Sequence, residues 1–171
     1  MILPILTYPH PTLKRKAEII KDIGKEARKL AENMAETMYD APGVGLAAPQ
    51  IGQSSRLIVL DPTGQKAQKL MVLVNPKIVA GEGEIEEEEG CLSIPGFIFK
   101  IKRYLKVRIM GYDPLKGKMI DVEADGLLAR IFQHEIDHLE GTLIIDHLGR
   151  LKKELYRRRI LKHLKHLKQK T

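Results

Sequence analysis

The 171-residue sequence contains a single cysteine, Cys91. One thiol excludes a disulfide within the chain and favours a reducing compartment. A long uninterrupted apolar run is also missing. The opening segment is apolar, but it is interrupted by Pro4 and Pro9, and it has no basic leader. We therefore expect neither a signal peptide nor a membrane span, and a cytoplasmic location. Aromatic residues are scarce, at 5%, and no RNA-binding motif is present, so we expect no reading of specific bases and no DNA partner.

Hydrophobic residues make up 43% of the chain and charged residues 30%, which is typical of a globular protein. The length suffices for one domain with a hydrophobic core but is too short for two, and no repeat or low-complexity linker divides it. We expect a single domain over residues 1–171, in which 148–171 form a basic C-terminal helix.

The formal net charge of +7 is concentrated in the C-terminal segment. From Arg150 to Thr171 there are ten Lys or Arg and one acid, a net charge of +9, so the rest of the chain carries −2. A concentrated basic segment favours an anionic partner more than a diffuse excess of lysine does. A solvated helix end explains it equally well.

Apolar residues recur at three- and four-residue spacing over 22–39 and predict a helix there, with Asp22 as its N-cap. Glycine and proline preclude a regular element over 41–52. Strand-like runs follow at 56–60, 70–75, 77–80, 84–89, 97–111 and 118–123. Two more helices are expected at 126–139 and 148–167, the second with these leucines on one side: Leu148, Leu151, Leu155, Leu161 and Leu164. Short strands between helices indicate an α+β domain, with antiparallel sheets packed around the central helix.

The segment His134-Glu-Ile-Asp-His138 lies on the expected central helix. Residues four apart share a helical face, so both imidazoles reach one metal ion. Glu135 adjoins the first of them, where its carboxylate reaches a metal-bound water without ligating the metal. The alternative is a polar stretch on an exposed helix, but apolar residues on both sides favour a buried one. We predict a metal site here.

A third protein ligand is needed to complete such a site. Cys91 is the best choice, because a thiolate binds divalent first-row metals well and this one is preceded by a glycine that permits close approach. Asp146, His147 and Glu154 stay open as alternatives. A lone cysteine is otherwise most often a small buried apolar residue.

Three segments, in this order, resemble the signature motifs of the peptide deformylase family. They are Gly43-Val-Gly-Leu-Ala-Ala-Pro-Gln50, Glu89-Gly-Cys-Leu-Ser93 and Gln133-His-Glu-Ile-Asp-His138. The likeness extends to residues 6–13 and to the strand pattern, so it covers essentially the whole chain. A single His-Glu-x-x-His is moderately specific, whereas all three segments in order are highly specific.

The resemblance implies a metal held by Cys91, His134 and His138, with water in the fourth position. Three protein ligands and one open position are typical of a catalytic ion. The family points to Fe(II) in the cell, with Zn(II), Ni(II) or Co(II) as substitutes. Sulfur and imidazole hold zinc or nickel more tightly than ferrous iron, so metal availability decides between them.

The implied reaction is removal of the N-formyl group from N-formylmethionyl peptides of newly made chains, which releases formate. Glu135 is implied as the general base that activates the water. The Gln50 side-chain amide, the Leu92 backbone N–H and the metal are implied to stabilise the oxyanion.

Substrate binding is expected to use the first signature segment and the central helix. Gly43 and Gly45 keep side chains away so that the peptide adds as a strand, although a tight turn would also explain them. Val44, Leu127 and Ile131 are the expected lining of a methionine pocket, with core packing as a nearly equal explanation.

The sequence departs from the family pattern at two positions. Ile98 stands where some relatives carry an arginine that contacts the peptide, and Arg130 stands where a pocket-side apolar residue is frequent. The resemblance also implies that Glu89 pairs with Arg103 to hold the cysteine loop, within an acidic run that is otherwise a solvated strand.

The basic helix is implied to dock near the ribosomal exit, and we expect a monomer. The expected contacts are Arg157, Arg158, Arg159 and Lys162.

Two other functional classes of protein share part of these sequence features. A zinc endopeptidase requires a third ligand other than Cys91, and a ribosome-associated protein with a vestigial site shows no turnover.

Overall fold

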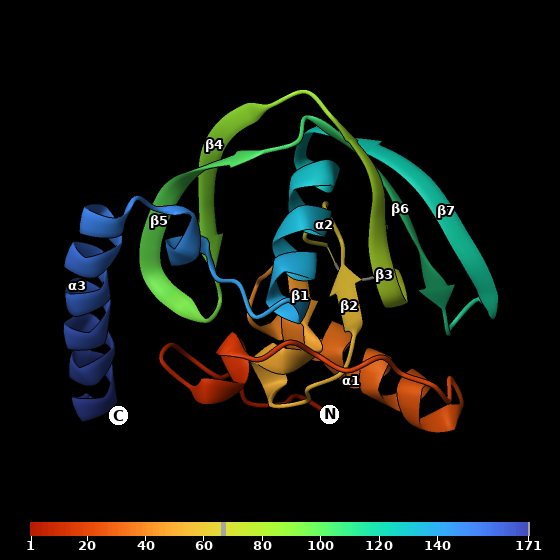
Figure 1. The fold of residues 1–171 in the computed structure, drawn as a ribbon. Coiled ribbons are helices and arrows are strands. Elements are labelled where there is room, and N and C mark those ends of the chain that lie inside the picture. Colours follow the sequence, from red (N-terminus) through yellow and green to blue (C-terminus); the bar gives the residue numbers. More distant parts are fainter. Residues whose placement is uncertain (66–67, 171) are drawn as a thin grey trace.

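The computed structural model describes residues 1–65 and 68–170. Its helices are α1 (Lys25–Asp40), α2 (Gly126–Leu139) and α3 (Arg150–Gln169), with short 3-10 helices at Pro11–Lys14, Ala48–Ile51 and Ile144–His147. Its strands are β1 (Gly45–Ala47), β2 (Leu57–Leu60), β3 (Met71–Glu82), β4 (Ile85–Cys91), β5 (Ile94–Arg103), β6 (Lys106–Asp113) and β7 (Lys118–Asp125). Figure 1 shows α2 at the centre, beneath the arch that β3, β4 and β5 form. The α+β class predicted from the sequence is confirmed.

A five-stranded antiparallel sheet in the order β1-β2-β3-β6-β7 lies between helices α1 and α2. Side chains alternate between its faces, as they do in any strand. Leu57 and Val59 of β2 pack with α1, whereas Ile58 and Leu60 pack with α2. The sheet thus has a helix on each face, and α2 is buried between this sheet and the rest of the molecule.

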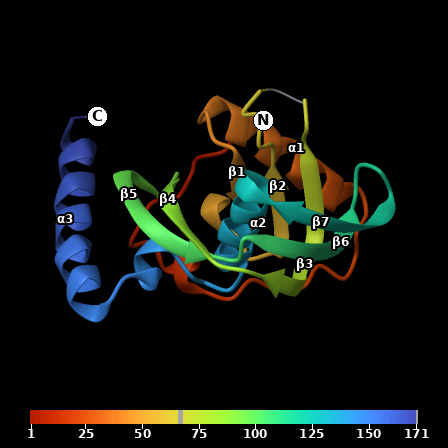
Figure 2. The same ribbon diagram turned by 90° about the horizontal axis from the view of Figure 1, so that it is seen from above.

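Strands β4 and β5 form a separate two-stranded hairpin. The hairpin packs in its own apolar cluster with the 3-10 helix Ile144–His147, the N-terminal segment and α3. Figure 2 shows α3 lying beside β5, away from the five-stranded sheet. The chain passes from β4 into Cys91 at the end of this hairpin, which places the cysteine next to α2.

The bounds of α2 agree with the prediction from sequence, but other elements differ. Helix α1 begins at Lys25 after an N-cap at Gly24 that makes no side-chain hydrogen bond, so Asp22 is not the cap. The segment 41–52, expected to be irregular, contains β1 and a 3-10 helix. The runs expected at 70–75 and 77–80 belong to one strand, β3, with an irregularity after Val74, and the run expected at 97–111 is divided between β5 and β6, which are separated at 104–105.

The buried face of α3 also differs from the apolar stripe expected from the sequence. Leu151 is 88% exposed and Leu155 is 48% exposed, whereas Ile160 and Leu164 are buried against the hairpin. The leucines of this helix are distributed around its whole circumference. The face that becomes buried is therefore determined by the elements that pack against the helix. No helix of the described ranges is long and apolar enough to span a membrane.

Candidate active site

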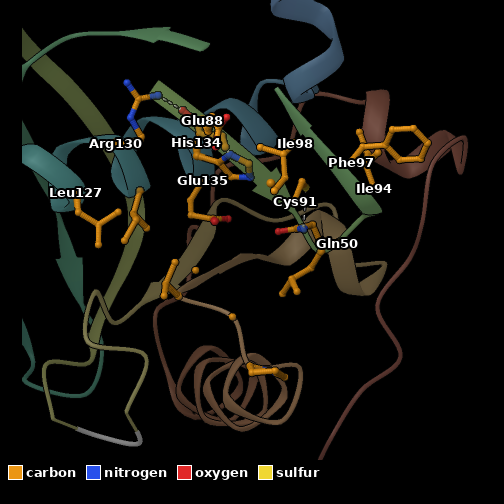
Figure 3. Close-up of a pocket in the computed structure, with 18 of the residues that line it drawn as sticks. Gln50, Glu88, Cys91, Ile94, Phe97, Ile98, Leu127, Arg130, His134 and Glu135 are labelled. Carbon is orange, nitrogen blue, oxygen red and sulfur yellow. Dashed lines mark hydrogen bonds and ion pairs between the residues drawn. The ribbon is translucent and has the colours of Figure 1, made fainter. Parts of the chain in front are cut away.

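Three potential metal ligands converge where the hairpin meets α2. His134 and His138 lie one turn apart on α2, and their Nε2 atoms are 3.3 Å from each other. Cys91 Sγ lies 3.4 Å from His138 Nε2, and the three ligand atoms are all within 4.8 Å of one another. Figure 3 shows Cys91 and His134 among the side chains that line a cavity. The structure therefore brings together the ligand set expected from the sequence.

This spacing fits one tetrahedral ion. With Zn–N of about 2.0–2.1 Å and Zn–S of about 2.3 Å, a tetrahedron places two nitrogens about 3.3 Å apart and sulfur about 3.6 Å from nitrogen. His134 also has its second ring nitrogen engaged, because Nδ1 lies 2.9 Å from Glu89 Oε1. Such an outer partner fixes the ring orientation of a metal-ligating histidine. The residues present fit a divalent metal ion.

The alternative ligands lie outside this cluster. Asp146 forms ion pairs with Lys14 and Lys153, and Glu154 forms an ion pair with Arg157 on the surface of α3. His147 Nε2 lies 2.8 Å from Asp137 Oδ2. Each of these carboxylates or rings is thus engaged elsewhere.

Glu135 is buried beside the two histidines. Its side chain is 4% exposed, and its Oε2 atom has no hydrogen-bond partner among the described residues. Burial raises the pKa of Glu135 to about 7. A carboxylate with a pKa near neutrality both accepts a proton and returns it, which suits a general base.

Gly45 makes room for the Glu135 carboxylate. A Cβ added at Gly45 would lie 2.4 Å from Glu135 Oε1, and one at Gly43 would lie 2.8 Å from Leu92 Cδ1. Gly45 lies in β1, and neither glycine has a positive φ. Close approach rather than a tight turn therefore explains both glycines.

Gly45→Ala is expected to fold normally but to lose most of its activity, because the new methyl group displaces the Glu135 carboxylate. A displacement of this kind costs on the order of 10²-fold in kcat. Turnover and thermal unfolding of the purified variant check this. Gly149→Ala is the matched control, since a Cβ there meets nothing within 4 Å and φ is −60°. Full activity of Gly45→Ala would show that Glu135 need not hold its position.

Gln50 lies on the 3-10 helix Ala48–Ile51 and is 2% exposed. Its Oε1 accepts a 2.9 Å hydrogen bond from the Ala47 N–H, which orients the amide. Nε2 then points toward the cysteine loop, where it donates to Ser93 Oγ at 3.1 Å and lies 3.8 Å from Cys91 Sγ. Sequence reasoning missed Ser93, although it stands inside the second signature segment. Leu92 lines the same cavity as Gln50.

Glu89 is the buried exception in an otherwise exposed acidic strand. Arg103 donates two hydrogen bonds of 2.8 Å to its carboxylate, as the family resemblance implies. Burial alone would raise the pKa of Glu89, but the hydrogen bonds from Arg103 and His134 outweigh it and hold that pKa well below its usual value. Glu89 is therefore ionised where it meets His134.

The cavity has a volume of about 560 Å³ and opens at an apolar rim. Val44, Ile98 and Leu127 line it and are 38%, 65% and 54% exposed, whereas Ile131 lies deeper and is 5% exposed. Figure 3 shows His134 and Glu135 between Leu127 and Ile98. Ile131 also belongs to the core beneath α2, but Leu127 does not, so Leu127 is free for a ligand.

Leu127→Ala is expected to weaken the preference for methionine about five-fold. The substitution removes apolar contact with the methionine side chain worth about 1 kcal/mol, which corresponds to that factor. The ratio of kcat/KM for formyl-Met-Ala-Ser to that for formyl-Ala-Ala-Ser measures the effect. Leu151→Ala, which changes an exposed leucine on α3, should leave the ratio unchanged. An unchanged ratio in Leu127→Ala would remove this residue from the pocket.

Comparison with known proteins gives a consistent result. The family model for polypeptide deformylase matches residues 2–154. The peptide deformylase of Thermodesulfovibrio yellowstonii is 54% identical over 159 residues, which cover 92% of this chain and 96% of that one. That of Syntrophobacter fumaroxidans is 48% identical and covers 96% of each. The crystal structure of a peptide deformylase from Legionella pneumophila is 43% identical, with a TM-score of 0.93 over 100% of this chain and 99% of that one. The resemblance drawn from three sequence segments is confirmed, and the chain belongs to the polypeptide deformylase family.

Proposed function

We propose that this chain, acting as one catalytic domain, removes the N-formyl group from N-formylmethionyl peptides and releases formate. One observation carries the proposal: three metal-ligand atoms lie within 4.8 Å of one another, and two of these residues, Cys91 and His134, line a cavity together with Glu135, whose buried Oε2 has no hydrogen-bond partner among the described residues. Metal-assisted amide hydrolysis requires a bound metal ion, a general base and a cavity that can hold the substrate.

The chemistry divides between a bound ion and the side chains around it. A divalent ion held by Cys91, His134 and His138 would act as a Lewis acid toward the attacking water and the formyl oxygen. Glu135 accepts a proton from that water as oxygen attacks the formyl carbon, and gives it to the leaving nitrogen as the C–N bond breaks. Gln50 Nε2 and the Leu92 N–H donate hydrogen bonds to the oxygen that becomes negative.

The peptide binds along the outer edge of β1. This strand ends the five-stranded sheet and pairs on one side with β2. An extended substrate adds to such an edge through backbone hydrogen bonds. Gly43 and Gly45 let it approach, while Val44, Leu127 and Ile131 receive the methionine side chain.

We assign Fe(II) as the cellular metal, with Zn(II), Ni(II) and Co(II) as substitutes. The Cys91 thiolate and two imidazoles would select zinc or nickel on affinity alone, so iron occupancy reflects supply in a reducing cytoplasm. Metal analysis of protein purified under anaerobic conditions tests this. Zinc in place of iron in freshly isolated protein would contradict it.

Formate release from formyl-Met-Ala-Ser by anaerobically purified, iron-loaded protein tests the function. Formate is expected, and treatment with a chelator should stop its release until metal is restored. The matched substrate acetyl-Met-Ala-Ser should react far more slowly, because its extra methyl group must fit beside the reacting carbon. Cleavage of internal peptide bonds without formate would instead support a zinc endopeptidase. Folded, metal-loaded protein that releases no formate would support a vestigial site.

We further propose that α3 docks the monomeric enzyme on the ribosome through its exposed basic face. Arg158 and Lys162 lie on this face, whereas Ile160 and Leu164 hold the helix on the hairpin. Deleting α3 would uncover that apolar cluster, so changes of charge test the proposal better than truncation.

Reversing the charge of Arg158 and Lys162 to glutamate is expected to weaken ribosome binding and leave turnover of a short peptide unchanged. Each lost phosphate contact lowers the log–log salt slope of binding by about one. Co-sedimentation with ribosomes at several salt concentrations measures it. Leu151→Gln, which changes the same helix without changing its charge, is the control. Unaltered binding by the charge-reversed protein would exclude this face.

A further inference from the structure

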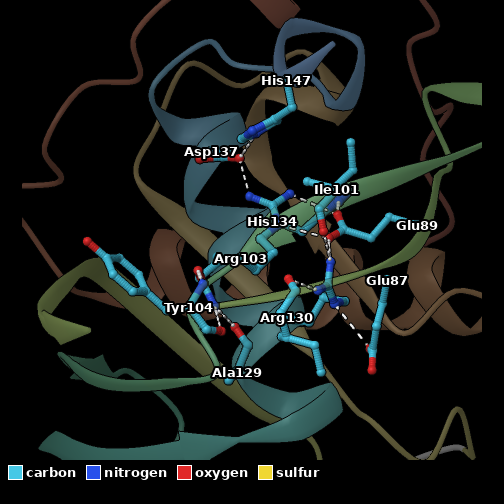
Figure 4. Close-up of polar contacts among 12 residues, drawn as sticks. Glu87, Glu89, Ile101, Arg103, Tyr104, Ala129, Arg130, His134, Asp137 and His147 are labelled. Atoms are coloured by element: carbon cyan, nitrogen blue, oxygen red, sulfur yellow. Dashed lines mark hydrogen bonds and ion pairs between the residues drawn. The ribbon is translucent and has the colours of Figure 1, made fainter. Parts of the chain in front are cut away.

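One side of α2 carries a row of polar side chains that face the β4–β5 hairpin. Arg130, Gln133, His134 and Asp137 recur at spacings of three and four residues, and all are buried or half-buried. Gln133 exchanges hydrogen bonds of 2.9 and 3.0 Å with the backbone of Tyr104, just after β5. Asp137 accepts a 2.5 Å hydrogen bond from Arg103 of β5. Figure 4 shows three of these residues, Arg130, His134 and Asp137, with their contacts to Glu89 and Arg103 of the hairpin.

The two elements that meet here belong to different apolar cores. The buried apolar residues of α2, such as Phe132 and Ile136, pack with the five-stranded sheet. Those of the hairpin, such as Phe99 and Ile101, pack with α3 and the N-terminal segment, in a cluster that includes no residue of α2 among those that the structure describes. Polar contacts therefore dominate the join between helix and hairpin.

The metal ligands lie on both sides of that join. Cys91 ends β4, whereas His134 and His138 belong to α2. The distance between the cysteine sulfur and the histidine nitrogens depends on how the hairpin sits on the helix. A shift between the two cores would change the geometry of the ligand set without altering either core.

Arg130 makes the broadest contact across the join. Its guanidinium donates to the backbone carbonyls of Ile101 on β5 at 3.0 Å and of Ile85 on β4 at 3.1 Å. It also forms an ion pair with Glu89, and a longer one of 3.4 Å with Glu87 at the surface. The fork of an arginine suits such simultaneous contacts, which a lysine cannot reproduce.

Glu89 connects Arg130 with metal ligands on both sides of the join, the cysteine of the hairpin and a histidine of α2. It stands two residues before Cys91, and its Oε1 atom lies 2.9 Å from His134 Nδ1. Arg103 also binds Glu89, but Arg103 belongs to the hairpin itself. Of the side chains that bind Glu89 from α2, His134 is a metal ligand and Arg130 is not.

We propose that Arg130 is a positioning residue that fastens the cysteine-bearing hairpin to the histidine-bearing helix and so sets the geometry of the metal site. It acts through Glu89 and the two strand carbonyls and is not one of the three metal ligands, although its side chain also lines the cavity. The inference rests on the metal site proposed above.

Cobalt substitution tests this role, because a thiolate bound to Co(II) gives a charge-transfer absorption band that reports the Cys91–metal bond. Co(II) is titrated into metal-free wild type, Arg130→Met and Arg130→Lys, and formate release is measured on each. In Arg130→Met we expect Co(II) binding to weaken about 10- to 100-fold, the range typical of lost outer partners, with a weaker or shifted thiolate band. Arg130→Lys should fall between the two, because it keeps the charge but not the fork.

Two controls separate positioning from general loss of stability. Arg108 forms a two-point ion pair with Asp121 on the exposed face of β6, so Arg108→Met removes a comparable pair away from the join. It should bind Co(II) as wild type does. If Arg130→Met does not fold, Arg130→Lys carries the test. A wild-type band and affinity in the folded Arg130 variants would overturn the proposal, whereas absence of the band from wild type would overturn the metal site itself.

Discussion

Glu135→Gln is expected to retain its metal and to lose turnover by a factor of about 10²–10⁴, the contribution typical of a general base. Glutamine has nearly the same shape as glutamate, so the close fit beside Gly45 is kept. It cannot accept the proton that the attacking water must lose. Because Glu135 is no part of the ligand cluster, metal content should not change.

Formate release and metal content, measured on the same preparation, check this prediction. Glu86→Gln makes the same chemical change at an exposed position on β4 and should have normal activity. A variant at position 135 that is active would move the base to another group. One that is inactive because it has lost its metal would make Glu135 a structural support for the ligands.

The sequence predicted the elements whose signals are local. The bounds of α2 follow from its apolar periodicity and from Gly141, whose φ is +75°. Its two histidines had to share a face, because four residues make about one helical turn. The third ligand is far away in sequence, and Cys91 was preferred on its chemistry and on the family resemblance rather than on any spacing.

What the sequence could not give depends on contacts between distant segments. Arg130 stood out only as a departure from the family, and nothing local indicates that it grips two strands. Likewise, leucines surround α3, so its buried face is decided by the aromatic side chains that the hairpin and helix bring together, such as Phe97, Phe99 and Tyr156. The short strand β1 escaped notice because glycine and proline flank it.

Cys91→Ser should lose both metal and turnover. A serine hydroxyl stays protonated near neutral pH and offers a hard oxygen where the site holds a soft thiolate, so the ion keeps two imidazoles alone. Losing an outer partner typically costs 10- to 100-fold in metal affinity, and losing a direct ligand should cost more than about 10²-fold. Formate release should fall in proportion to the metal lost.

Metal stoichiometry after exhaustive dialysis, together with formate release at saturating Fe(II), distinguishes the causes. Ser93→Ala changes the same loop, where Ser93 accepts a hydrogen bond from Gln50, but leaves the three ligands in place. It should therefore keep its metal even if turnover slows. If Cys91→Ser also keeps one ion per chain, the third ligand is another residue, and the hairpin would no longer supply part of the metal site. In that case the polar join between hairpin and α2 would serve the fold and not the chemistry.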